Sequence, residues 1–242
     1  MTEAGTRHSS YHAPDGTDLV RLTPGPEPAG PLVSLVHNQL RAMFLSTAYT
    51  CLGAATAIRR GNYRLGVYPP LASPEAVEGT AADLTRFTRE HPEPEHPVAV
   101  FVSVFDGPVR TGEADFEADL WRHLAALDET NPGRTDAHPH PGTAADPGFV
   151  YSGRNFFVVG LHPAASRWAR RFAWPTLVFN ALSHGDPLRE ADQFDRMTER
   201  IRNRDRRLQG EVNPSLEFSR LSQFSGRAID ADWTCPVHRP PR

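Results

Sequence analysis

The sequence predicts a mixed α+β fold, built as a single domain with a central β-sheet flanked by helices. Helical and strand patterns follow one another in mixed order along the chain, which favours one central sheet. The length of 242 residues suits one domain or at most two, and an apolar fraction of 39% can build a core. We expect a flexible N-terminal leader, residues 1–31, followed by a single catalytic domain, residues 32–242.

The first part of the chain contains the leader, two helices and a short strand. Residues up to about 30 are rich in Pro, Gly and polar groups, so we expect them to be mobile. Apolar residues at near-helical spacing predict a helix over Leu32–Leu45. The small-residue-rich stretch Cys51–Arg60 predicts a second helix that stops at Gly61. Weak alternation over Tyr63–Tyr68 predicts a short strand.

The middle of the chain has clearer patterns. A helix is expected over Glu75–Glu90, with Ser73 as its cap and Pro74 in its first turn. The apolar run Val98–Phe105 predicts a buried strand, and Asp115–Leu127 has the apolar stripe of an amphipathic helix.

The last part of the chain begins with a long loop, residues 129–148, rich in Pro, His, Gly and Asp. Strands are expected over Phe156–Leu161 and Thr176–Asn180, with a short helix over Ala164–Phe172 between them. The charged stretch Asp186–Leu208 predicts another helix.

Composition excludes several classes of function. The net charge of −3 gives no electrostatic reason to expect nucleic acid or an acidic membrane surface as a partner. No segment approaches the roughly 18 consecutive apolar residues of a membrane span, and the polar N-terminus lacks a signal core, so we expect a cytoplasmic protein. The chain contains no lysine, which excludes a pyridoxal phosphate Schiff base and a P-loop.

Motif spacing excludes two further classes of site. Cys51 and Cys235 form no CxxC pair, so a zinc site made mainly of cysteines is excluded. Gly53 and Gly61 have neither the spacing nor the strand–helix setting of a dinucleotide fingerprint. A bound flavin or nicotinamide is therefore not indicated.

The apolar run that ends at Leu161 is followed directly by His162 and Pro163. This order places an imidazole at a strand end, where α/β scaffolds display chemistry. The polar residues that follow are too clustered, and too rich in Asn, Gln and Arg, for an ordinary solvated face.

A series of short motifs carries a family resemblance over about residues 44–236. The C-terminal pieces are Gly160-Leu161-His162-Pro163, Ser166-Arg167, Arg170-Arg171-Phe172, Asn180, Arg204-Asp205, Leu208-Gln209-Gly210, Asn213-Pro214, Gln223 to Arg227, and Cys235-Pro236. Thinner upstream pieces include Cys51 with Gly53, and the strand Phe101–Phe105. In order and spacing the chain resembles the YqcI/YcgG family, although Thr50 stands where proline is common.

That family includes haem-dependent N-hydroxylases of guanidine-bearing amino acids, such as the arginine N-hydroxylase of cycloserine biosynthesis and the pre-guanitoxin N-hydroxylase. The resemblance implies haem b iron, O2, an arginine-like substrate and electrons from an external reductase. Without a CxxCH motif the haem would be non-covalent. The oligomeric state is left open, with a homodimer as one option. The alternative hypothesis is a haem-binding or haem-sensing protein without turnover.

His162 is the first candidate for the axial haem ligand, because haem iron is held by His, Cys, Met or Tyr. A histidine satisfied by a nearby carbonyl is the structural alternative. Cys51 is the rival ligand, since a thiolate would favour O–O cleavage, although a small buried core residue would also fit its setting. Arg167, Arg170 and Arg171 could pair with haem propionates or a substrate carboxylate, or form a solvated basic face.

Asp205 is the candidate acidic partner for a cationic substrate. Its structural alternative is an ion pair within its own helix, with Arg202 or Arg206. Asn213 precedes a proline and is biased towards an extended conformation, so its side chain would cap a turn or face a ligand. Arg227 has the same two readings, as a cofactor-binding residue or a structural one.

Overall fold

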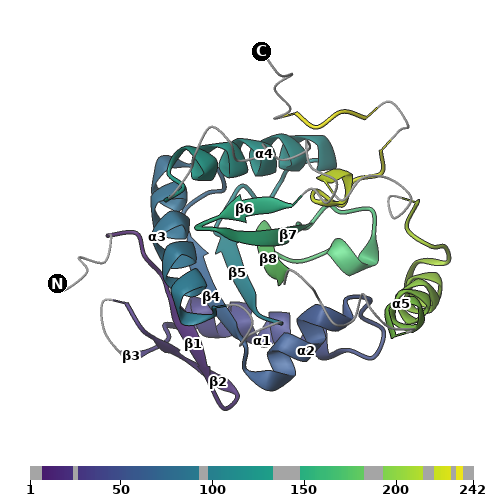
Figure 1. The fold of residues 1–242 in the computed structure, drawn as a ribbon, viewed down its shortest axis with the longest axis horizontal. Coiled ribbons are helices and arrows are strands. Elements are labelled where there is room, and N and C mark those ends of the chain that lie inside the picture. The colour runs from purple at the N-terminus through teal and green to yellow at the C-terminus, as the bar shows by residue number, and fades with distance from the viewer. Residues whose placement is uncertain are drawn as a thin grey trace.

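An eight-stranded mixed sheet forms the middle layer of the molecule, with helices on both faces (Figure 1). The computed structural model describes residues 7–23, 27–92, 98–132, 148–182, 193–214, 221–229 and 233–236. The strand order is β3-β2-β1-β4-β5-β8-β7-β6. The strands are β1 (His12–Asp15), β2 (Asp18–Arg21), β3 (Glu27–Pro28), β4 (Tyr63–Tyr68), β5 (Val100–Phe105), β6 (Phe149–Tyr151), β7 (Arg154–Leu161) and β8 (Thr176–Leu182). The expected α+β domain with a central sheet is confirmed.

Strand β5 lies at the centre of the sheet, and all six of its residues are buried. It runs parallel to β4 and antiparallel to β8, and β8 is in turn antiparallel to β7. Its side chains alternate between two cores, because successive residues of a strand point to opposite faces. Phe101 and Phe105 join one apolar cluster, while Val100, Val102 and Val104 join the other.

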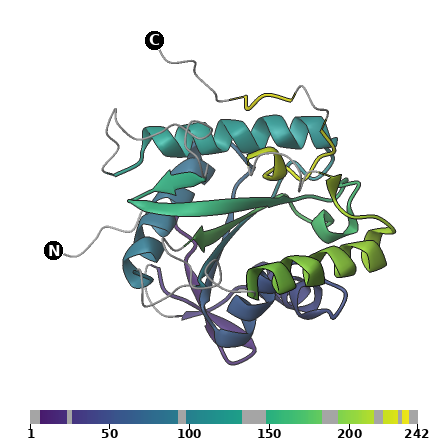
Figure 2. The ribbon, with the colours of Figure 1, turned by 45° about the vertical axis from the view of Figure 1, so that its right-hand side comes forward.

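The helices divide between these two clusters. Helices α1 (Pro31–Leu45) and α2 (Leu52–Arg60) cover the valine face of β5, and α3 (Pro74–Glu90) and α4 (Glu113–Glu129) cover its phenylalanine face. Helix α5 (Gln193–Gln209) lies at the side, next to the 3-10 turn Trp168–Arg170 (Figure 2).

The predicted helix ends agree with the structure where local chemistry determines them. The Ser73 hydroxyl accepts a hydrogen bond from the Ala76 amide at 3.2 Å and caps α3. Gly61 ends α2 in the left-handed region at φ 69°.

The expected helix over Ala164–Phe172 is wrong, because the chain turns back directly after β7. A bridge between His162 and Arg171 leaves room for only the short 3-10 turn.

The expected flexible leader is also wrong for residues 7–23 and 27–31. Strands β1 and β2 form a hairpin, and β1 continues the sheet by pairing with β4. Tyr11 is fully buried, and its ring lies 6.2 Å from that of Phe101. Composition is misleading here, since among the described residues Pro14 lies within β1 and Gly30 and Pro31 begin α1. Strand β6 follows the loop expected over residues 129–148, in a stretch for which the sequence analysis predicts no element.

Some predictions fall outside the described residues. They concern most of the loop expected over 129–148, of which residues 133–147 are not described, and residues 186–192 of the last predicted helix.

Tyr11→Ala should destabilise the protein, because the hairpin is part of the core. We expect a loss of about 3–5 kcal/mol of unfolding free energy, measured by urea denaturation. Tyr11→Phe keeps the ring and removes only the hydroxyl that donates to Glu90, so it should cost about 1 kcal/mol. A flexible leader would leave both variants as stable as the wild type.

His123 on α4 is an unusual core residue. Its side chain is fully buried and packs edge-on against Phe105, at a ring-centroid distance of 5.0 Å. Within the described part of the chain, neither of its ring nitrogens has a hydrogen-bond partner. Burial lowers the pKa of His123 from 6.5 to about 3, so the ring is neutral in the folded protein at neutral pH.

Because of His123, the free energy of unfolding should fall as the pH is lowered. Between pH 6.5 and about 3 the unfolded chain binds a proton that the folded state does not, so lowering the pH favours unfolding. Between pH 7 and 5 the wild type should lose about 2 kcal/mol more stability than His123→Leu. Urea titrations of both proteins at the two pH values measure this difference, and equal losses would contradict the explanation.

Candidate functional site

Motif segments far apart in the sequence meet at the end of β7. The Gly160 amide donates to the Phe224 carbonyl at 2.7 Å, which joins the strand to the C-terminal segment 221–229. A methyl group at Gly160 would lie 2.7 Å from Phe116 Cε1 and 2.9 Å from the Phe224 oxygen. Only glycine permits this close approach, which brings α4 and the C-terminal segment against the strand that presents His162.

His162 is 1% exposed and its ring stacks on Phe116, with centroids 4.3 Å apart. Its Nδ1 is a buried atom without a hydrogen-bond partner among the described residues. Burial lowers the pKa of His162; the charge of Glu113 opposes this shift and that of Arg170 adds to it. The imidazole is therefore neutral at pH 7 and can offer a nitrogen lone pair to a metal.

Cys51 is the N-cap residue of α2, and its sulfur accepts a hydrogen bond from the Ala54 amide at 3.4 Å. Burial raises the pKa of the thiol, while that amide and the positive charge of Arg170 act to lower it. The burial effect is the larger one, so the surroundings of Cys51 keep the thiol protonated at neutral pH.

Arg170 connects the two candidate ligands. Its Nη1 donates to the carbonyls of Gly160 and Phe224, at 3.1 and 3.4 Å, and its Nη2 donates to that of Gln223 at 3.0 Å. Burial lowers the pKa of Arg170, and it interacts electrostatically with both Cys51 and His162. A strand end, a helix N-terminus and the C-terminal segment therefore meet around one guanidinium group.

Cys51 and Arg170 are both partly accessible. Each residue keeps part of its surface exposed, and burial is the largest cause of both pKa shifts. The adjacent Tyr49 is only 5% exposed and forms part of the surrounding protein. A small molecule could reach Cys51 and Arg170 with less rearrangement than His162.

Asp205 forms a buried ion pair that sequence reasoning did not predict. Its Oδ2 lies 2.8 Å from Arg167 Nη2, and the two side chains are only 6% and 9% exposed. The same oxygen accepts from the Asn213 amide at 2.5 Å. Asp205 is thus paired neither with Arg202 nor with Arg206, and the chain's own Arg167 takes the place expected for a substrate guanidinium.

The two remaining arginine candidates differ. Arg171 donates from Nε to the Ala165 carbonyl at 2.6 Å and lies over the Trp168 ring at 4.0 Å, so much of its guanidinium group stays uncommitted. Arg227 forms an ion pair with Glu117, with Nη2–Oε2 at 2.7 Å and Nε–Oε2 at 2.8 Å. Arg227 therefore ties the C-terminal segment to α4.

Glu117 is a residue that sequence reasoning missed. It is 6% exposed and accepts hydrogen bonds from Ser225, Arg227 and Trp233. A signal was present, because a glutamate on the apolar face of an amphipathic helix requires a buried polar partner. The partners lie more than a hundred residues away, and no local pattern identifies them.

Among the described residues around Arg170, Cys51 and His162 are side chains of the types that can ligate a haem iron. Within the described ranges, no three His, Cys, Asp or Glu side chains gather as metal ligands. A haem needs only one or two axial ligands, which Cys51 or His162 can supply. Arg167, Arg170 and Arg227 are committed to protein partners, which leaves Arg171 as the candidate for a propionate.

Breaking the buried ion pair should destabilise the fold. Asp205→Ala leaves the Arg167 guanidinium buried without its carboxylate, and we expect a loss of about 3–5 kcal/mol in urea denaturation. The double variant Arg167→Met with Asp205→Leu should recover most of this loss. Arg206→Ala, an exposed site on the same helix, is the control and should change stability by less than about 0.5 kcal/mol. Equal stability of Asp205→Ala and the control would contradict a buried pair.

Comparison with known proteins identifies the family. The sequence profile of the YqcI/YcgG family matches residues 40–238, which include every candidate ligand and arginine described above. No curated protein and no solved structure matches the chain. No helix in the described part of the chain combines the length and hydropathy needed to cross a membrane. The chain belongs to the YqcI/YcgG family.

Proposed function

We propose that the protein is a haem-dependent monooxygenase that hydroxylates a nitrogen of an amino acid or amine. A guanidine nitrogen, as in arginine, is the preferred target. One observation carries the proposal: the motif segments Gly160–Pro163 and Gln223–Arg227 meet at Arg170, whose charge also acts on both candidate axial ligands. Membership of the YqcI/YcgG family supports it.

Cys51 is the better placed of the two ligands. It is partly exposed and accepts a backbone hydrogen bond at a helix N-terminus. Burial raises the pKa of its thiol, so an iron that bound there would have to displace the thiol proton. His162 is nearly inaccessible and would have to leave its stack on Phe116 to reach a metal. We therefore reverse the order of preference that the sequence suggests and keep His162 as the second candidate.

Haem b, when bound, supplies the activation of O2 and the transfer of one oxygen atom to an N–H group. The chain's own residues bind and orient. Arg171 is the cation available to a propionate or a substrate carboxylate, because among the described residues its guanidinium makes one hydrogen bond, to the Ala165 carbonyl. Arg170 and the Arg167–Asp205 pair hold the segments around Cys51 and His162 in place. Electrons would come from a separate reductase.

An absorption spectrum tests the cofactor and its ligand. Protein purified from haem-supplemented cells should show a Soret band, and its ferrous–CO form should show the red-shifted band of a thiolate ligand. Cys51→Ala should lose that band, whereas Cys235→Ala, the matched cysteine control, and His162→Ala should keep it. A ferrous–CO band without the red shift, together with loss of the Soret band in His162→Ala alone, would make His162 the ligand. Folded protein without haem in every sample would contradict the proposal.

Turnover separates the enzyme from a haem-binding protein without activity. With a reductase, NADPH and O2, arginine should gain one oxygen atom by mass spectrometry, while ornithine, which lacks the guanidine group, should not. A protein that binds haem but leaves a panel of guanidine compounds unchanged would be a sensor or carrier.

A further inference from the structure

A cavity of about 1000 Å³ lies on the opposite face of the sheet from Cys51. It opens between α3, the C-terminal half of α4 and the N-terminal hairpin. Small side chains leave this space, since Ala72, Ala81, Ala82 and Ala126 line it where larger residues would fill the gap between the helices. Leu22, Val77, Pro132 and Tyr151 add further apolar surface. A mostly apolar hollow with a few polar groups is the usual form of a small-molecule site.

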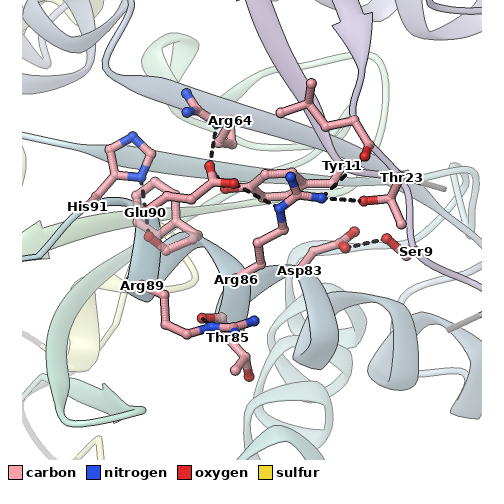
Figure 3. A network of polar contacts seen from close by, with 12 residues as sticks. Ser9, Tyr11, Thr23, Arg64, Asp83, Thr85, Arg86, Arg89, Glu90 and His91 are labelled. Atoms are coloured by element: carbon pink, nitrogen blue, oxygen red, sulfur yellow. Dashed lines mark hydrogen bonds and ion pairs between the residues drawn. The ribbon is translucent and has the colours of Figure 1, made fainter. Parts of the chain in front are cut away.

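Arg86 on α3 lines this cavity in a fixed orientation (Figure 3). Its Nε donates to Glu90 at 2.8 Å, and its Nη1 donates to Thr23 Oγ1 at 2.9 Å and to the Leu22 carbonyl at 3.3 Å. Its guanidinium also lies over the Tyr11 ring, 4.8 Å from the centroid. Among the described residues Nη2 has no partner, so a held guanidinium keeps uncommitted donors.

The two carboxylates near Arg86, those of Glu90 and Asp83, also bind other groups, so they do not fully balance the charge of the guanidinium. Glu90 is shared, because it also pairs with Arg64 at 3.1 Å and accepts from the Tyr11 hydroxyl at 2.8 Å (Figure 3). Asp83 also lines the cavity, but it accepts hydrogen bonds from Ser9, Ser10 and Tyr68. A half-buried guanidinium with a shared counter-ion attracts a further anion.

The rim restricts the charge of that anion. Arg89 lines the cavity one turn after Arg86, but Glu78 and Glu129 line it as well. Glu78 and Glu129 are exposed and solvated, so they act only weakly on a ligand, but they disfavour a dianion more than a single carboxylate and hold an amine only weakly. Among the described lining residues, Tyr151 is of a type that can ligate haem iron, and its hydroxyl donates to the Ala81 carbonyl at 3.3 Å.

We propose that this cavity binds a small organic monocarboxylate with an apolar body, its carboxylate on Arg86 and its body against the alanine-lined walls. This site is separate from Cys51 and His162, and it does not depend on haem or on turnover. It would give the protein a second small-molecule ligand.

Calorimetric titration of the full-length protein with octanoate tests the proposal, with 1-octanol and octylamine as the neutral and cationic probes of equal length. Octanoate should bind, and both other probes should bind at least about tenfold more weakly. No octanoate binding up to about 10 mM, or equal binding of 1-octanol, would overturn the proposal.

Variants locate the site. Arg86→Gln should weaken octanoate binding at least about tenfold, because it removes a charged hydrogen-bond donor, while Arg122→Gln on the exposed face of α4 should not. Ala82→Leu should block the cavity while keeping the positive charge of Arg86, and Ala125→Leu, outside the lining, is its control. Ala82→Leu decides the question if Arg86→Gln fails to fold. Unchanged affinity in the folded Arg86→Gln or Ala82→Leu protein would overturn the assignment.

Discussion

The C-terminal third of the chain depends on one guanidinium group. Arg170 donates to three carbonyls, one at the end of β7 and two in the C-terminal segment 221–229. A cation with several carbonyl acceptors can join backbone segments that have no ladder between them, because each acceptor would otherwise lose its hydrogen bond to water. The position of that segment against β7, and with it the surroundings of His162, follow from this interaction.

Two buried ion pairs extend the same arrangement. Arg167–Asp205 joins the turn after β7 to α5, and Arg227–Glu117 joins the C-terminal segment to α4. Both partners of the first pair belong to the short motifs read in the sequence, whereas in the second pair Arg227 belongs to a motif and Glu117 lies on the distant helix α4. The charged residues that looked like ligands for a substrate are therefore largely the residues that assemble the site. Among the described residues of this region, Cys51, Arg171 and the Nδ1 of His162 keep uncommitted capacity.

Local chemistry made much of the fold predictable. Ser73, Gly61 and the apolar runs that became β5 and β7 determine their elements with short-range signals. The hairpin β1–β2 escaped prediction because its strands have only four residues each, and their burial comes from long-range contacts such as Tyr11 with Phe101. For the same reason the sequence indicated which residues of the site matter but not their partners. Asp205 pairs with Arg167 across 38 positions, and the Arg86 cavity results from the packing of α3 against α4.

The burial of the N-terminal hairpin also bears on how the protein can be synthesised. After Met1 the next methionine is Met43, which lies inside α1. Translation that started there would omit β1, β2, β3 and most of α1. The product would expose the edge of β4 and the apolar surface that Tyr11 covers, so it would be a substrate for proteases or an aggregate rather than a shorter working form.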